Sequence, residues 1–148
     1  MEYFIINTAV ASVYKDATHQ SEMVTQALFG ETCEIIDQKN DWYFTKQWDG
    51  YEGWIYSFNG LVTKEKYKPN FILNELYGKI TDKNGEVIRN IVFGARVKGE
   101  KDGDRYKIKM PNGDKVFSDN TFSLKPLTAT RKNIVNIANK FLGSPYLW

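Results

Sequence analysis

The sequence has very few of the residues that build metal centres and disulfides. Among 148 residues it contains one cysteine, Cys33, and one histidine, His19. A single cysteine excludes an internal disulfide and a cysteine-based zinc site, and a single histidine excludes a multi-histidine metal centre. The glycines mark turns and form no phosphate-binding loop. We therefore expect neither a metal nor a cofactor.

Long apolar runs are also lacking. The sequence has no run of about 18 apolar residues, so no membrane span is expected. Its first residues have neither the basic start nor the long apolar segment of a signal peptide. These features predict a cytoplasmic protein, or a periplasmic or cell-wall protein if a leader has been removed.

Charge is nearly balanced over the whole chain but not along it. The formal net charge of +2 is too small to indicate nucleic acid as a partner. Residues 1–67 carry a charge of −5 and residues 68–148 carry +7. The basic residues of the second part do not alternate with aromatic residues as on an RNA-binding sheet, so no nucleic acid partner is expected. The polar segment at residues 64–70, which contains Pro69, is typical of a linker.

The residues before this linker predict a small β-barrel. Aromatic residues make up 15% of the chain, which is typical of β-rich packing or of a binding surface. Asp49-Gly50 is a hairpin turn signal between two aromatic segments. The spacing predicts five or six short strands within about 60 residues, which favours a barrel over a βαβ unit.

The second part repeats the first. Phe29-Gly30 recurs as Phe93-Gly94 at an offset of 64 residues, and Asp49-Gly50 recurs as Asn112-Gly113 at an offset of 63. The same turn signals in the same order predict two copies of one barrel. We expect a mainly β chain with one barrel at residues 1–66 and a degenerate second barrel at residues 70–127.

The remaining residues, 128–148, predict a helix. Thr130 is a suitable N-cap, and apolar residues recur with helical spacing from Ile134 to Leu142. Gly143 stands where a helix C-cap is expected. The sequence then ends in Ser-Pro-Tyr-Leu-Trp. We expect this segment to lead into a further domain.

Two residues have side chains suited to nucleophilic catalysis. Cys33 shares a predicted strand face with Ile35, which favours a small buried hydrophobic residue. A reactive thiolate needs a nearby base, and the one candidate is His19, in a polar loop 14 residues earlier. Nothing in the spacing brings the two together, so a Cys33–His19 dyad is not expected. The close carboxylate pairs, such as Glu31 with Glu34, are expected to be solvated in turns and on exposed strand faces.

Six tryptophan and tyrosine residues lie between positions 42 and 56. A barrel of this size cannot bury all of them, because alternate residues of a strand face outward. Trp42 and Trp54 are predicted to pack in or against the core. Tyr51, in the turn at residues 49–53, is the best candidate for an exposed functional aromatic residue.

Three segments resemble one known protein family. Residues 24–31 (Val-Thr-Gln-Ala-Leu-Phe-Gly-Glu), 41–42 (Asp-Trp) and 50–55 (Gly-Tyr-Glu-Gly-Trp-Ile) are similar to the first bacterial SH3 domain of NlpC-type cell-wall cysteine peptidases. The chain resembles in particular the γ-D-glutamyl-L-diamino acid endopeptidases of the dipeptidyl-peptidase VI type. Those proteins have two bacterial SH3 domains followed by a papain-like catalytic domain. Residues 141–148 are similar to the segment that opens the catalytic domain.

The resemblance implies roles for particular residues. Tyr51 matches a family tyrosine that lines the active site and helps restrict substrates to peptides with a free N-terminal L-Ala. Tyr146 matches a tyrosine that assists substrate or oxyanion binding near the nucleophile. The family's catalytic cysteine and histidine have no match, so no catalytic residue is expected in this chain.

One departure from the family concerns the substrate amine. Some members have a glutamate at the position of Val24 as a partner for that amine, and a valine cannot fill this role. Either Glu22 or a carboxylate beside Tyr51, Asp49 or Glu52, is expected to replace it, or amine recognition is weaker.

The resemblance therefore implies a substrate-recognition region. It would position peptides for a peptidoglycan-peptide cysteine endopeptidase that cleaves after γ-D-Glu, as in murein peptide recycling. The expected partners are murein peptides with a free N-terminal L-Ala and a papain-like catalytic domain in cis. The alternative is a stand-alone SH3-like module that binds cell-wall or protein ligands. Residues 141–148 favour the first function, because a binding module has no use for them.

Overall fold

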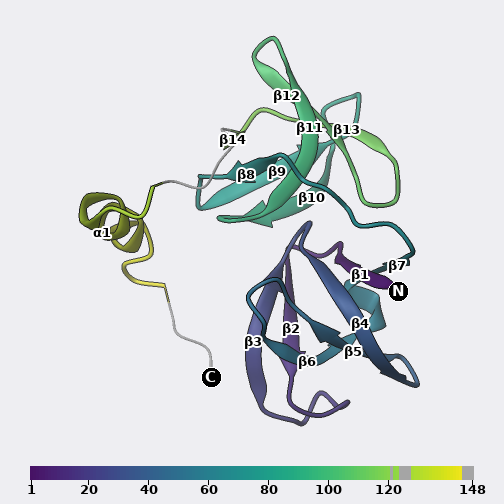
Figure 1. Cartoon of the computed structure of the whole chain (residues 1–148). Coiled ribbons are helices and arrows are strands. Elements are labelled where there is room, and N and C mark those ends of the chain that lie inside the picture. Colours follow the sequence, from purple (N-terminus) through teal and green to yellow (C-terminus); the bar gives the residue numbers. More distant parts are fainter. Residues whose placement is uncertain (121, 124–127, 145–148) are drawn as a thin grey trace.

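The computed structural model describes residues 1–120, 122–123 and 128–144, and most of its secondary structure is β. Two antiparallel seven-stranded sheets follow one another along the chain, and each curls into a small barrel (Figure 1). We call β1–β7 the first barrel and β8–β14 the second barrel. The predicted mainly β fold, with two SH3-like barrels and one C-terminal helix, is confirmed.

The strands of both barrels are short. Those of the first barrel are β1 (Tyr3–Ile6), β2 (Val10–Tyr14), β3 (Met23–Leu28), β4 (Thr32–Lys39), β5 (Trp42–Lys46), β6 (Glu52–Tyr56) and β7 (Gly60–Thr63), with a 3-10 helix η1 (Ser57–Asn59) before β7. Those of the second barrel are β8 (Phe71–Leu73), β9 (Tyr77–Thr81), β10 (Val87–Val92), β11 (Arg96–Asp102), β12 (Arg105–Lys109), β13 (Lys115–Ser118) and β14 (Phe122–Ser123).

The two barrels have the same strand order. Neighbouring strands run β3-β2-β6-β5-β4-β1-β7 in the first and β10-β9-β13-β12-β11-β8-β14 in the second. Equivalent residues also pair alike. Trp54 of β6 pairs with Tyr14 of β2, and Phe117 of β13 pairs with Thr81 of β9. The repeat predicted from the turn signals is therefore confirmed.

One pair of repeated turn glycines lies where the barrels meet. Gly30 and Gly94 both have left-handed backbones, with φ of 79° and 86°. A Cβ on Gly30 would lie 1.7 Å from the carbonyl oxygen of Arg96, and a Cβ on Gly94 would lie 3.0 Å from Leu28 Cδ1. The backbone N–H of Arg96 donates to the carbonyl oxygen of Phe29 at 2.8 Å. Glycine is needed here both for the turn and for the close approach of two backbones.

Phe29 joins the cores of the two barrels. It follows β3 of the first barrel, yet its fully buried side chain belongs to the hydrophobic cluster of the second barrel, which includes Leu73, Ile91 and Val97. The first barrel has a separate cluster that includes Phe4. Because one barrel supplies a core residue of the other, we expect the two to unfold together.

Tyr67 fastens the segment between the barrels. Its hydroxyl donates to the carbonyl oxygen of Lys109 at 2.8 Å and accepts the backbone N–H of Lys98 at 2.7 Å. Its own carbonyl oxygen accepts the Thr32 hydroxyl at 3.2 Å. Burial raises the pKa of Tyr67 to about 12, so the hydroxyl keeps the proton that it donates. The tyrosine thus binds β11 and β12 on one side and β4 on the other.

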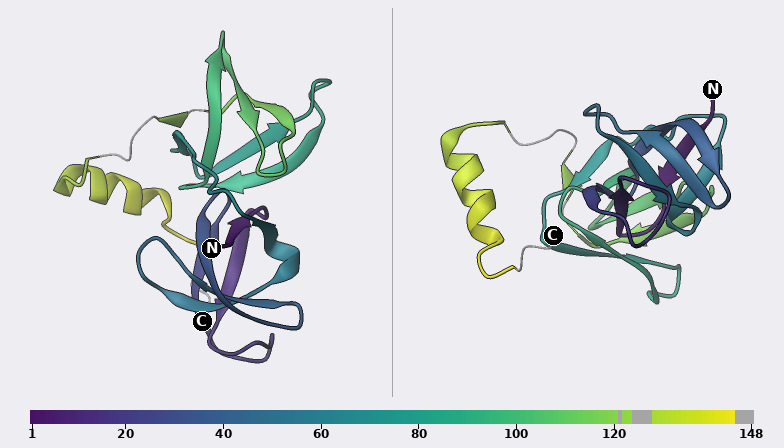
Figure 2. Two further views of the ribbon diagram at one scale, coloured as in Figure 1. Left: turned by 45° about the vertical axis from the view of Figure 1, so that its right-hand side comes forward. Right: turned by 90° about the horizontal axis from the view of Figure 1, so that it is seen from below.

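The C-terminal helix, α1 (Arg131–Lys140), lies beside the barrels (Figures 1 and 2). The Thr130 hydroxyl oxygen accepts the backbone N–H of Asn133 at 3.2 Å, as expected of an N-cap. The helix ends at Lys140 rather than at the predicted Leu142, and a turn that contains Gly143 follows. It is the one α-helix in the described part of the chain, and it is too short and polar to cross a membrane.

Few contacts hold α1 to the second barrel. None of its residues is buried. The rings of Phe141 and Phe93 meet edge to face with centroids 5.6 Å apart, and the Lys140 ammonium donates to the Asn74 carbonyl oxygen at 3.3 Å. The helix has the predicted apolar side chains, but the barrels cover few of them.

Candidate functional site

The turn between β5 and β6 carries the exposed aromatic residue that the sequence singles out. The Gln47 N–H donates to the Tyr51 carbonyl oxygen at 2.8 Å, and the Gly50 N–H donates to the Gln47 carbonyl oxygen at 3.1 Å. Gly50 has φ of 89°, which glycine adopts without strain. The Asp49 carboxylate accepts the Tyr51 N–H at 3.2 Å. These bonds fix the backbone of the turn at both ends and in its middle.

The Tyr51 side chain is 53% exposed, so it does not serve the core. Trp42 is buried, and Trp54 is half-buried against Phe44 with ring centroids 5.2 Å apart. The division predicted among these aromatic residues is thus confirmed. Trp48, which the sequence did not distinguish from the others, is also exposed, at 66%.

Two of the three acidic residues proposed as partners for an amine are already paired. Glu52 accepts the Lys46 ammonium at 2.9 Å, and this bond raises the pKa of Lys46. Glu22 lies 4.0 Å from the Lys15 ammonium, and both side chains are exposed. For Asp49 the described part of the chain provides no ion pair, and its carboxylate accepts the Tyr51 N–H. Asp49 is therefore the least neutralised carboxylate near Tyr51.

Val24 lies at the base of this turn. A Cβ placed on Gly53 would lie 3.3 Å from Val24 Cγ2 and 2.6 Å from Val13 Cγ1, so β6 passes close to both valines. Val24 is partly buried against the cluster of the first barrel. Val24 therefore lies next to the Tyr51 turn, with an apolar side chain that packs on the barrel.

Arg96 of the second barrel contacts two turns of the first barrel. Glu31, which follows the Phe29-Gly30 turn, is 7% exposed, and one of its carboxylate oxygens lies 4.0 Å from the Arg96 guanidinium. The same guanidinium lies over the Trp48 ring, 4.7 Å from its centroid. Arg96 thus holds together the turn before β4 and the turn after β5.

The prediction that Glu31 is solvated is wrong. Desolvation in the contact between the barrels raises the pKa of Glu31, and the nearby Arg96 charge and hydrogen bonding from Trp48 and Gln47 only partly oppose the rise. The turn pattern that placed Glu31 at a surface did not reveal that a second barrel covers that surface. The available signal was its position directly after a repeated Phe-Gly pair.

Cys33 and His19 lie in different surroundings. Cys33 is fully buried in the cluster of the first barrel, and burial together with the charges of Glu31 and Asp49 raises the pKa of its thiol to about 12. His19 is exposed and packs against Trp42, with ring centroids 4.6 Å apart. The interpretation of Cys33 as a small buried hydrophobic residue is confirmed, and its protonated thiol is unsuited to nucleophilic attack.

Tyr146, the other residue that the resemblance marks for substrate binding, lies outside the described residues. The structure therefore brings together Tyr51, Asp49 and Glu52 in one turn and adds Trp48 and Arg96 beside it. This set offers an exposed phenol and a carboxylate, which suit recognition of a small cationic or polar group, whereas the Arg96 guanidinium already lies over the Trp48 indole.

The strand order and the turn together define a tandem of SH3-like barrels. Residues 13–57, which make up most of the first barrel, match the family described as the bacterial dipeptidyl-peptidase SH3 domain. The match contains β3 to β6 and therefore the whole Tyr51 turn. The family resemblance stated from the sequence is confirmed.

Two comparisons extend beyond the first barrel. The chain is 25% identical over 154 residues to a γ-D-glutamyl-L-lysine dipeptidyl-peptidase of Bacillus cereus, and the match covers 88% of this chain and 46% of that protein. The chain thus spans about half the length of this curated relative. Its fold resembles the crystal structure of an NlpC/P60 family protein from Bacillus cereus, with a TM-score of 0.77 and 18% identity over 99% of this chain and 65% of that one.

Proposed function

We propose that this chain is the substrate-recognition and positioning region of a peptidoglycan-peptide cysteine endopeptidase that cleaves after γ-D-Glu. In this proposal a papain-like catalytic domain follows the chain, and the barrels supply no catalytic residue. The observation that carries the proposal is the exposed Tyr51 on a hydrogen-bonded turn inside the segment that matches a dipeptidyl-peptidase SH3 domain.

The substrates in this proposal are murein peptides with a free N-terminal L-Ala. A phenol such as that of Tyr51 presents both a π-face and a hydroxyl to an ammonium group. Asp49, whose carboxylate lies next to Tyr51 and is not in an ion pair among the described residues, supplies the negative charge that Val24 cannot. Glu52 and Glu22 contribute less because Lys46 and Lys15 already neutralise them.

In this proposal the contact between the barrels holds the Tyr51 turn in one orientation relative to the second barrel. Arg96 of the second barrel packs on Trp48 in the Tyr51 turn and approaches Glu31 before β4. Tyr146 is assigned to substrate binding by the family resemblance alone. The proposed site of action is the cytoplasm, or the periplasm or cell wall for a protein made with a leader.

The proposal is tested on the longer protein that contains the catalytic domain. Dipeptide release from L-Ala-γ-D-Glu-L-Lys peptides is compared for the intact protein and for its catalytic domain alone. We expect the barrels to be required for efficient release and for preference of a free over an acetylated N-terminus. Equal rates and equal preference without the barrels would contradict the proposal.

The choice of Asp49 is tested separately. Asp49→Asn removes one charge and keeps the side-chain oxygen that accepts the Tyr51 N–H, and Glu52→Gln is the matched control in the same turn. We expect Asp49→Asn to lower kcat/KM for the free amine about tenfold while Glu52→Gln has a smaller effect. A larger loss of kcat/KM in Glu52→Gln than in Asp49→Asn would indicate that Glu52 binds the substrate amine.

A further inference from the structure

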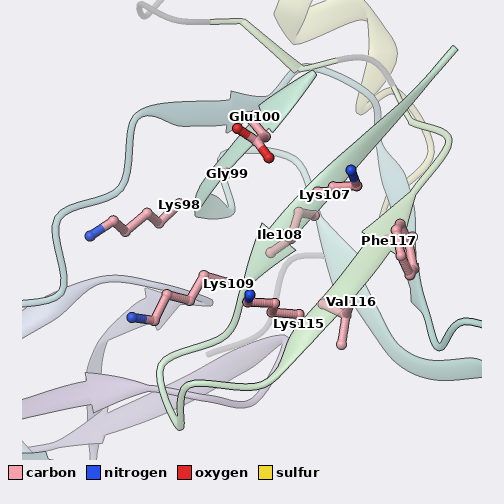
Figure 3. Close-up of a pocket in the computed structure, with 9 residues that line it drawn as sticks. All are labelled: Lys98, Gly99, Glu100, Lys107, Ile108, Lys109, Lys115, Val116 and Phe117. Carbon is pink, nitrogen blue, oxygen red and sulfur yellow. The ribbon is translucent and has the colours of Figure 1, made fainter. Parts of the chain in front are cut away.

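Three lysines lie side by side on the outer face of the second barrel. Lys98 of β11 pairs with Lys109 of β12, and Lys109 pairs in turn with Lys115 of β13. All three are exposed, and Figure 3 shows the side chains of Lys98 and Lys109 extending toward the same side. Like charges directly opposite one another on neighbouring strands destabilise a sheet. Folding alone therefore does not account for this row.

Neighbouring acidic groups do not neutralise the row. In the part of the chain that the structure describes, none of the three lysines forms an ion pair, whereas the adjacent Lys107 lies 3.2 Å from Asp102. Their positive charge is thus available to a ligand.

The row borders a groove. A cavity of about 420 Å³ lies along the three strands, and Glu100 is the one acidic residue among those that line it. Gly99 contributes backbone to the groove, and a Cβ on it would lie 2.2 Å from the carbonyl oxygen of Lys107. The backbones of β11 and β12 are therefore closely packed along the groove.

The basic surface continues into the segment between the barrels. A smaller cavity of about 140 Å³ shares Lys98 and Lys109 with the groove and also contacts Lys68, with Glu65 as the acidic residue that lines it. Tyr67 places the two cavities next to each other, because its hydroxyl bridges the backbones of Lys98 and Lys109. We call Lys68, Lys98, Lys109 and Lys115 the lysine track.

We propose that the lysine track binds a linear polyanion with a phosphate backbone and no bases. Neighbouring strands lie about 4.8 Å apart, so three lysines in a row spread their charge over about 10 Å. That spread suits successive phosphates of a polymer better than one phosphate ion. The one aromatic residue in the groove, Phe117, is covered by the Arg105 guanidinium 4.1 Å from its ring centroid. No ring in the groove is therefore open for base stacking, which single-stranded nucleic acids require for tight binding.

The test measures binding of inorganic polyphosphate to the full chain at several salt concentrations. The triple variant Lys98→Gln, Lys109→Gln, Lys115→Gln is compared with a matched control that removes three exposed lysines elsewhere, Lys39→Gln, Lys83→Gln, Lys132→Gln. We expect the track variant to bind polyphosphate more than tenfold more weakly than the wild type. In a plot of log K against log salt concentration, its slope should be smaller in magnitude by about 3. The control should keep most of the affinity.

A stability measurement separates lost binding from lost folding. Because the track variant removes like-charge pairs, its Tm should equal or exceed that of the wild type. The proposal is overturned if the wild type does not bind polyphosphate, or if both triple variants lose affinity equally. It is also overturned if oligo(dT) of matched charge binds more tightly than polyphosphate, or if orthophosphate competes as well as the polymer at equal phosphate concentration.

Discussion

Phe29 and Phe93 occupy the same position in the two barrels, and each packs against the element that follows its own barrel in the chain. Phe29 is buried in the hydrophobic cluster of the second barrel, and Phe93 contacts the ring of Phe141 just after α1. The repeated Phe-Gly turn therefore joins the first barrel to the second through Phe29, and the second barrel to the residues after α1 through Phe93. The difference lies in burial, since Phe29 is fully buried and Phe93 only partly.

Replacing Phe29 tests the coupling between the barrels. Phe29→Ala removes a fully buried ring from the second cluster, and we expect the free energy of unfolding to fall by about 3–5 kcal/mol. The measurement is urea denaturation followed by tryptophan fluorescence in a Trp148→Phe background, which reports on the first barrel because the three remaining tryptophans lie in or near β5 and β6. Phe58→Ala, at an 80% exposed position of the first barrel, is the control and should change stability little. An unchanged midpoint in Phe29→Ala would show that the barrels unfold independently.

The α1 helix should be only marginally stable in this chain by itself. A ten-residue helix without buried residues gains little from packing, and helices of this length are weak in water. Hydrogen exchange should show fast-exchanging α1 amides beside protected amides in β4 and β5. Protection of α1 equal to that of the strands would contradict the expectation that a further domain normally covers its apolar face.

Because of Glu31, the free energy of unfolding of the chain should decrease as pH rises above about 4.5. The pKa of Glu31 in the folded state is raised above the ordinary value near 4.5, so the folded state keeps this proton at a pH where the unfolded state has released it. The contribution is fully present below about pH 4.5 and is lost as pH rises through the folded-state pKa. Glu31→Gln removes this loss, so its Tm advantage over the wild type should grow between pH 4 and pH 7.

The partner of Glu31 provides a second test of the same assignment. The Arg96 charge lowers the pKa of Glu31 and so limits the loss of stability as pH rises. Arg96→Gln should therefore steepen the decrease of Tm with pH, provided that Glu31 is intact. A Glu31→Gln variant whose advantage shrinks as pH rises would contradict the sign of the shift.

This chain by itself should release no dipeptide from L-Ala-γ-D-Glu-diamino acid peptides. Burial raises the pKa of Cys33 to about 12, so almost no thiolate exists near neutral pH. Iodoacetamide should modify Cys33 only in denaturant. Turnover that disappears in Cys33→Ala would contradict this account and restore the Cys33–His19 dyad.

Much of the architecture could be predicted from the sequence because it is encoded locally. Gly30 and Gly94 mark turns whose backbones need glycine, and Thr130 marks the start of a helix. The exposed position of Tyr51 also followed from its turn. Each of these features depends on a few consecutive residues.

The contact between the barrels could not be predicted in the same way. Glu31 and Arg96 are 65 residues apart, and their contact depends on how one folded barrel docks on the other. The burial of Phe29 in the second cluster has the same origin. The row formed by Lys98, Lys109 and Lys115 appears only once the strand register is known, because the three residues are not neighbours in sequence.

The central claim, that the first barrel recognises the substrate amine through Tyr51, has a direct test. In a protein that joins this chain to the proposed papain-like catalytic domain, kcat/KM is measured for peptides with free and with acetylated N-terminal Ala, for the wild type, Tyr51→Ala and the exposed control Tyr77→Ala. Contacts to an ammonium worth about 1–2 kcal/mol predict a loss of about 5- to 30-fold on the free peptide for Tyr51→Ala. The loss should narrow the preference for the free amine without a change in Tm, and Tyr77→Ala should behave as the wild type. Full activity and full selectivity in a folded Tyr51→Ala protein would contradict the account.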